Sequence, residues 1–294
     1  MKPRPNLSAW KSPEAEARFR EREDALVREL AAEVPTPVDV STRLGPTRVY
    51  RWPGAGDPVV FLHGTSGTSF AWAPYAERRD GRAMDAVDTI GDVGRSRQEL
   101  AVEDGGDLSG WLAETLAGVG IERAHLVGTS YGGFLALNLA ARRPELVRSL
   151  FLIDPAAVVP FRLLPFMLWG TAALFASWLP TPLRLRAARR LRMPALEDPR
   201  LIRFALYGQL NHRTRLLRPE PLTDDQLRSI EQPVHLVLGG KSEVFPSAAV
   251  RERAEALLPH VTVEVVEDAG HAVSISHIDL ITDRLTTFLT SAST

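Results

Sequence analysis

A serine enclosed by glycines is the strongest chemical signal in the chain. The run Gly128-Thr129-Ser130-Tyr131-Gly132 follows an apolar stretch at 124–127 and precedes an apolar helical pattern at 131–143. A sharp turn between strand and helix holds such a serine in a strained backbone conformation, and the glycines let the two elements approach closely. The hydroxyl then lies at a helix N-terminus, where partial positive charge favours a developing anion. The motif predicts that Ser130 is a nucleophile.

A serine hydroxyl is a weak nucleophile at neutral pH and needs a general base. Of the seven histidines, His271 is the best candidate, because it follows the predicted strand at 261–266 in the run Asp268-Ala269-Gly270-His271. A loop after a strand can present an imidazole to the site. The other histidines are assigned to strand cores (His125, His235), the loop after an early strand (His63), an inserted segment (His212), a helix-to-strand loop (His260) and the start of the last helix (His277).

The base in turn needs a carboxylate that fixes its tautomer and stabilises the imidazolium. Glu243 lies in the loop Gly239-Gly240-Lys241-Ser242-Glu243, after the predicted strand at 234–238. Asp154 directly follows the predicted strand at 150–153 and is the alternative. Chain order, with the acid between serine and histidine, fits both. Glu243 is favoured, and Asp154 stays open.

Acyl transfer also needs donors for a tetrahedral oxyanion. The backbone N–H of Tyr131, directly after the nucleophile, is one expected donor. The second is expected from the loop that follows the predicted strand at 59–62, with the N–H of Thr65 as the candidate.

Other chemistries find little support in the sequence. The chain has no cysteine, which excludes thiolate nucleophiles and disulfides, and its formal net charge of -1 argues against general nucleic-acid binding. The Gly-containing run at 88–96 lacks the Gly-Lys-Ser/Thr ending of a phosphate loop, so Asp88 is expected to brace a turn. No cluster has metal-ligand spacing, and neither a metal nor a cofactor is predicted.

The elements that must position these residues alternate along the chain. Short apolar runs typical of buried strands are separated by helical patterns, which predicts an α/β fold: a mostly parallel sheet with helices on both faces. A helix is expected at 12–32, with Ser12 as its cap. The predicted runs are Val59–Leu62, Met84–Ile90, His125–Val127, Leu150–Ile153, Val234–Leu238 and Val261–Val266.

One insertion interrupts the alternation. We assign residues 1–46 to an N-terminal helix and linker, 47–155 and 231–294 to the α/β core, and 156–230 to a helical cap over the site. An insertion at the carboxyl ends of strands lies where such sheets bind ligands. Its large apolar side chains suggest an apolar acyl or alcohol pocket, with these candidates: Phe161, Phe166, Met167, Trp169, Phe175 and Trp178.

Within the cap, residues 163–179 carry no charge but fall short of the roughly 20 apolar residues of a membrane span. We therefore predict a lid rather than stable membrane insertion. The arginines that follow Pro182 are interpreted as the solvated face of an amphipathic helix, with an acidic partner or membrane headgroups as the alternative. The N-terminus lacks the apolar run of a signal peptide, so a cytoplasmic location is expected.

Taken together, these pieces resemble the α/β-hydrolase superfamily, and within it small bacterial serine carboxylesterases. The resemblance rests on the serine run and on Phe61-Leu62-His63-Gly64, the 88–96 turn, Gly-Gly-Lys-Ser-Glu243 and Ala-Gly-His271, and it covers the chain from about Pro58. It implies an oxyanion loop after His-Gly, a helical cap after the sixth strand, and activity on small-molecule carboxylic esters or related acyl compounds. Most relatives carry Asp in the acid loop where this chain carries Glu243.

The expected reaction is a two-step acyl transfer from an apolar ester through an acyl-enzyme on Ser130. Three alternatives use the same scaffold: a lactonase or carbon–carbon bond hydrolase, a non-hydrolytic lyase or acyltransferase, and a binding protein with a vestigial triad.

Overall fold

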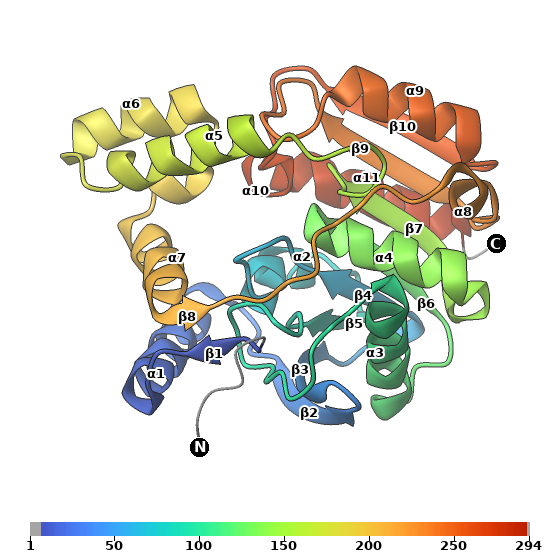
Figure 1. Cartoon of the computed structure of the whole chain (residues 1–294), viewed down its shortest axis with the longest axis horizontal. Coiled ribbons are helices and arrows are strands. Elements are labelled where there is room, and N and C mark those ends of the chain that lie inside the picture. Colours follow the sequence, from blue (N-terminus) through green and yellow to red (C-terminus); the bar gives the residue numbers. More distant parts are fainter. Residues whose placement is uncertain (1–6, 293–294) are drawn as a thin grey trace.

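An eight-stranded sheet organises the chain, as the alternation of strands and helices predicted (Figure 1). The computed structural model describes residues 7–292. The strands of this sheet are β2 (Thr36–Thr42), β3 (Gly45–Trp52), β4 (Ala55–Leu62), β5 (Arg82–Val87), β6 (Ala124–Thr129), β7 (Val147–Ile153), β9 (Val234–Gly239) and β10 (Val261–Val266). Their order across the sheet is β10-β9-β7-β6-β4-β5-β3-β2. β3 pairs antiparallel with β2 and β5, and the other pairs are parallel.

Helices cover both faces of the sheet because its central strands are apolar on both sides. In β6, Leu126 belongs to the core under one layer of helices and the next residue, Val127, to the core under the other. The first layer contains α3 (Gly105–Gly118), α4 (Tyr131–Arg142) and α9 (Ser247–Leu257). The second contains η1 (Ser69–Trp72), α2 (Ala73–Ala76), α10 (Val273–Ser276) and α11 (Ile278–Ala292). A short turn, η2 (Pro144–Leu146), leads into β7.

The sheet begins earlier than the sequence analysis placed it. Residues 1–46 were assigned to a helix and linker, whereas β2 pairs with β3 from Thr36 onward. Val40 of β2 is buried in the core. This edge strand, TPVDVST, is covered on only one side. Its polar residues therefore alternate with apolar ones, and it lacks the continuous apolar run by which the buried strands were recognised.

The insertion between β7 and β9 is helical, and its helices pack partly on one another. A small core of its own contains Ala173, Ala188 and Leu196. Among the residues described, no helix is long and apolar enough to cross a bilayer. The elements are α5 (Leu163–Ala176), α6 (Thr181–Leu191), η3 (Pro194–Leu196), α7 (Pro199–Asn211), β8 (His212–Arg213) and α8 (Asp224–Arg228), of which α8 packs against α9 of the core.

The N-terminal helix α1 (Pro13–Leu30) braces this cap. Ser12 caps it through its side chain, as predicted. Phe19 stacks on Phe204 of α7 with ring centroids 4.7 Å apart. A two-residue strand, β1 (Ala9–Trp10), also pairs antiparallel with β8. The sequence analysis missed this pairing, because so short a strand leaves no periodic pattern.

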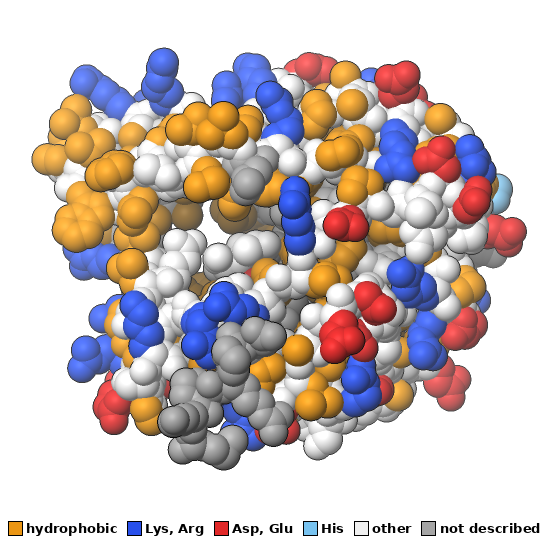
Figure 2. All heavy atoms as spheres, in the orientation of Figure 1, with side chains coloured by type: hydrophobic (Ala, Val, Ile, Leu, Met, Phe, Trp, Pro, Cys, Tyr) orange, Lys and Arg blue, Asp and Glu red, His pale blue; other side chains and the backbone are white. Residues whose placement is uncertain are grey.

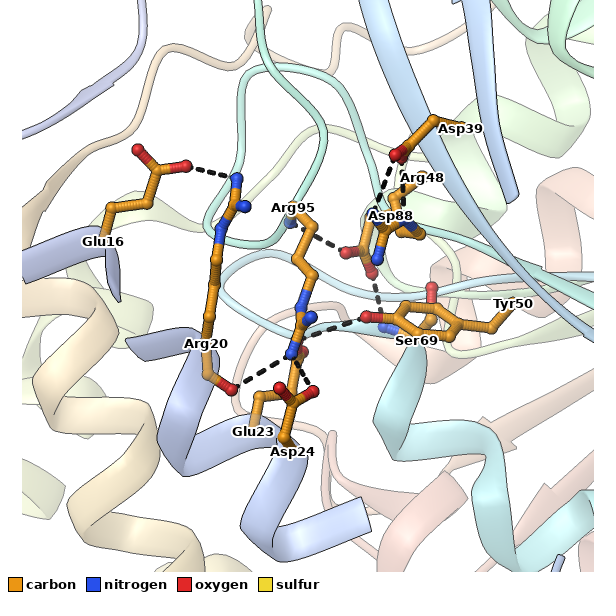
Figure 3. Close-up of polar contacts among 10 residues, drawn as sticks. All are labelled: Glu16, Arg20, Glu23, Asp24, Asp39, Arg48, Tyr50, Ser69, Asp88 and Arg95. Carbon is orange, nitrogen blue, oxygen red and sulfur yellow. Dashed lines mark hydrogen bonds and ion pairs between the residues drawn. The ribbon is translucent and has the colours of Figure 1, made fainter. Parts of the chain in front are cut away.

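One turn after Phe19, on the same buried face of α1, the carboxylate of Glu23 holds the loop after β5 (Figure 3). Arg95 donates to Glu23 over 2.5 Å and also to the half-exposed Asp24. Tyr50 donates to the same Glu23 oxygen from 3.3 Å. Burial raises the pKa of the Glu23 carboxyl to about 7, and the negative charge of Asp88 adds to this, whereas Arg95 lowers it.

Glu23 should therefore make stability depend on pH. The folded protein keeps a proton that the unfolded chain releases near the ordinary glutamate pKa of 4.5, so the free energy of unfolding should fall as pH rises from about 4.5 to about 7. The slope from one such group reaches at most about 1.4 kcal/mol per pH unit. We expect Glu23→Gln to remove this contribution, measured by urea unfolding across the pH range.

Asp24→Asn is the matched control, because it removes a half-exposed carboxylate from the same arginine and should leave the slope unchanged. Parallel curves for wild type and Glu23→Gln would contradict the raised pKa.

Candidate active site

Ser130 lies at the tight turn between β6 and α4 that the sequence predicted. Its backbone has φ 50° and ψ −113°, a strained conformation for a residue with a side chain. The glycines on either side are required by close approach. A Cβ on Gly132 would lie 1.9 Å from the carbonyl oxygen of Leu62, and one on Gly128 would lie 2.5 Å from that of Gly132. The turn therefore presents the serine where β4, β6 and α4 meet.

The imidazole of His271 joins this serine to a buried carboxylate. His271 Nε2 lies 3.0 Å from Ser130 Oγ, and His271 Nδ1 lies 2.6 Å from Asp154 Oδ2. The Asp154 side chain is fully buried and that of His271 is 12% exposed. Residues that are distant in the sequence thus form one hydrogen-bonded line from acid to base to hydroxyl. The predicted pairing of Ser130 with His271 is present in the structure.

The prediction that Glu243 orients the imidazole is wrong in its geometry. The Glu243 carboxylate accepts the backbone N–H of His271 over 3.2 Å and forms an ion pair with Arg192 of the cap over 3.1 Å. The ring nitrogen Nδ1 instead contacts Asp154, the alternative left open by the sequence. Both loops reach the same sheet edge because β7 and β9 are adjacent, so their order in the chain did not distinguish them.

Asp154 is held firmly at the end of β7. Ser242 donates its hydroxyl to Asp154 Oδ2 over 2.6 Å, and the N–H of Gly239 reaches Oδ1 over 3.3 Å. Its own backbone has φ 42°. The one signal in the sequence that pointed to this role was an acidic residue directly after a strand that is buried on both faces.

The loop after β4 lies directly against the nucleophile. A Cβ on Gly64 would lie 3.3 Å from Ser130 Cβ. Ser66 N–H donates to Asp92 over 2.8 Å and Gly67 N–H to Gly64 over 3.0 Å, so both amides are engaged. Burial raises the pKa of Asp92 to about 6. The nearby His63 and the backbone N–H groups of Val93 and Ser66, which donate to Asp92, act in the opposite direction and lower this pKa.

The two predicted oxyanion donors are backbone amides beside this loop. Tyr131 is the first residue of α4, where an N–H has no partner within the helix. Thr65 lies between Gly64 and Ser66, and no hydrogen bond of its N–H is found in the described part of the chain. The assignment of both as oxyanion donors stays a prediction.

The histidines assigned to structural roles have them. His125 bonds Ser149 over 2.7 Å, and burial lowers its pKa to about 4. His235 stacks on Phe151 with centroids 5.1 Å apart. His63 accepts the N–H of Thr89 over 3.0 Å and so shapes the loop beside Ser130. The expected turn brace is also present, because Asp88 accepts the N–H of Arg95 in its own loop and the N–H of Ser69 in η1.

The cap side chains proposed for the pocket divide into two groups. Trp169 lies edge-on to His271 with centroids 6.3 Å apart, and Phe166 and Phe161 continue from it toward the core. Met167, Phe175 and Trp178 instead point to solvent, and Trp178 is 80% exposed. Phe245, which follows the β9 loop, was not predicted and lies 5.6 Å from His271 between ring centroids.

No group of three or more acidic or histidine side chains in the described part of the chain is arranged to hold a metal ion. The hydrogen-bonded line of Asp154, His271 and Ser130 is the arrangement that activates a hydroxyl for attack on a carbonyl carbon.

Comparison with known proteins agrees with this geometry. Residues 59–283 match the alpha/beta hydrolase family. Carboxylesterase YbfK of Bacillus subtilis is 30% identical over 85% of this chain and 86% of its own. The uncharacterized carboxylesterase nap of the same organism is 28% identical over 85% of each chain. The crystal structure of naproxen esterase from Bacillus subtilis superposes with a TM-score of 0.82 at 25% identity, over 95% of this chain and 99% of that one. The chain belongs to the alpha/beta hydrolase family.

Proposed function

We propose that this protein is a carboxylesterase that works through an acyl-enzyme on Ser130. The observation that carries the proposal is the unbroken contact from Asp154 through His271 to Ser130, with distances of 2.6 and 3.0 Å. The similarity to carboxylesterases over most of the chain supports the same activity.

In the first step, Ser130 Oγ attacks the ester carbonyl carbon while His271 Nε2 takes its proton. Asp154 holds the Nδ1 proton of the imidazole and stabilises the positive charge that the ring gains. The backbone N–H groups of Tyr131 and Thr65 donate to the oxyanion. His271 then returns the proton to the departing alcohol, and the acyl group remains on Ser130.

In the second step, water attacks the acyl-enzyme with His271 again as base. The oxygen of the water bonds to the acyl carbon, and His271 takes one of the water's protons. His271 then gives this proton to Ser130 Oγ as the bond from Oγ to the acyl carbon breaks and the carboxylic acid leaves. In this mechanism Asp154, and not Glu243, is the carboxylate that orients the imidazole. Glu243 positions the backbone of His271 by accepting its N–H.

The substrate proposed for this site is a small-molecule apolar ester. Trp169 and Phe245 border the imidazole with aromatic surface, and Phe166 packs on Trp169. Such a surface binds apolar acyl or alcohol groups by excluding water. Phe161 connects Phe166 to Phe245, with centroids 5.1 and 6.2 Å away.

Ser130→Ala should reduce kcat on nitrophenyl esters at least about a thousandfold while the protein stays folded. A fluorophosphonate probe should label wild type stoichiometrically and the variant not at all, measured by intact mass. A wild type that resists labelling would support a binding protein with a vestigial triad. Labelling together with weak turnover of every ester in a panel of acyl and alcohol lengths would favour a carbon–carbon bond hydrolase.

Asp154→Asn should lower kcat on the order of a thousandfold or more, because the amide cannot hold the imidazole in the required tautomer. Glu243→Gln keeps an oxygen that can accept the backbone N–H of His271, so its loss should stay below about tenfold. Steady-state kinetics on one ester compares the two. A Glu243→Gln variant as impaired as Asp154→Asn would overturn the assignment of the acid.

Trp169→Ala should raise KM for long-chain esters more than for acetate esters, by about tenfold, because the lost surface contacts the chain rather than the reacting carbonyl. Leu210→Ala, which truncates an exposed side chain of cap helix α7, is the control and should leave the ratio unchanged. A uniform loss of kcat across the ester series would contradict a role in binding the chain.

A further inference from the structure

The cap exposes an apolar surface that neither the fold nor the active site explains. Among the described residues, twelve large hydrophobic side chains are exposed, and eight of them lie between residues 164 and 183. The most exposed are Trp178 at 80% and Phe175 at 71%. Figure 2 shows hydrophobic side chains gathered over α5 and α6, with Lys and Arg side chains along the edge of the same region. We call this the cap surface: Leu164, Met167, Leu168, Leu174, Phe175 and Trp178.

Helix α5 is apolar on two opposite faces. Phe166, Trp169 and Ala173 recur at helical spacing and turn inward, toward the active site and the core of the cap. Leu164, Leu168 and Phe175 recur at the same spacing on the reverse face and are exposed. A helix that is apolar all round is normally buried on every side. The outer face of α5 therefore lacks the partner that its composition implies.

The charge of the cap indicates the kind of partner. Residues 155–196 contain six arginines and no aspartate or glutamate, in a chain whose net charge is -1. Arg162, Arg186, Arg189 and Arg190 are exposed, and no ion pair of theirs is found within residues 7–292. Three of these arginines, with Arg192, line one open hollow on α6. An apolar face beside unpaired arginines complements a surface that offers both acyl chains and phosphates.

We propose that the cap surface docks on bilayers that contain anionic phospholipid. The exposed side chains of α5 enter the boundary between headgroups and acyl chains, and the arginines of α6 contact lipid phosphates, with their long stems reaching along the interface. Trp178 at the end of α5 has the amphipathic ring that favours this boundary.

The docking is peripheral. The 14 residues of α5 span about 21 Å at 1.5 Å per residue, less than the roughly 30 Å of a hydrocarbon core, so the helix lies along the surface. A second copy of this chain is a poorer partner. A twofold interface would place the same basic segments close together, without an acidic residue in them to offset the repulsion.

The position of α5 links docking to the site. Trp169 on its inner face is next to His271, while Phe175 on its outer face is exposed. A docked cap would hold the active site next to a medium in which apolar esters concentrate. The binding itself does not depend on the proposed esterase activity.

Vesicle co-sedimentation of the full chain tests the proposal. Ser130→Ala is the parent, so that lipid cleavage cannot alter the vesicles. We expect the parent to bind vesicles of phosphatidylcholine mixed with phosphatidylglycerol, and to bind phosphatidylcholine alone at least about tenfold more weakly. Phe175→Ser with Trp178→Ser should reduce the partition coefficient on mixed vesicles at least about tenfold. Arg186→Gln with Arg189→Gln and Arg190→Gln should reduce it similarly, and high salt should reproduce the loss.

The matched control removes three exposed arginines outside α5 and α6, by Arg142→Gln, Arg143→Gln and Arg218→Gln, and should bind like the parent. Circular dichroism and thermal unfolding establish that each variant is folded. The proposal is overturned if the parent does not bind mixed vesicles, or if the control loses as much as the cap variants. It is equally overturned if analytical ultracentrifugation shows a dimer that Phe175→Ser with Trp178→Ser dissociates, because a second copy would then cover the surface.

Discussion

The approach of three main-chain segments around Ser130 is the constraint on which the rest of the structure depends. The carbonyl of Leu62 at the end of β4 lies so close to the first turn of α4 that only glycine fits at position 132. This contact fixes where α4 begins relative to β4 and β6. It therefore fixes the nucleophile, the amide after it and the loop that starts at His63. The strained φ of Ser130 follows from joining a strand to a helix in so little space.

Two of the functional residues could be read from the sequence because their signals are local. Ser130 has glycines at fixed offsets, and His271 follows a strand by a short loop. The choice between Glu243 and Asp154 is not local. It depends on which carboxylate faces the imidazole, and that is decided by Ser242, which anchors Asp154, and by Arg192, which draws Glu243 away. Arg192 lies in the cap, 51 residues before Glu243, where no periodic pattern could reveal the contact.

The fold was predictable to the same degree and for the same reason. Strands buried on both faces, such as β6 and β7, are continuous apolar runs and were located to within a few residues. The edge strand β2 alternates polar and apolar residues and was assigned to the N-terminal linker rather than to the sheet, and the β1–β8 pairing joins two distant segments by only two residues each. Which cap aromatics face the site could not be read either, because α5 is apolar on both faces.

Because Asp154 at the end of β7 bonds the imidazole, Glu243 has a different role in the same site. Glu243 accepts the backbone N–H of His271 while it pairs with Arg192, so the cap and the base are held by one chain of contacts. Gly270 makes this possible. A Cβ there would lie 2.9 Å from both Arg192 Cβ and the Glu243 carboxylate. Arg192 itself ends α6 in the left-handed conformation, with φ 48°. The cap is thus joined to the active site through the backbone of the base, at a position where only glycine leaves room for the junction.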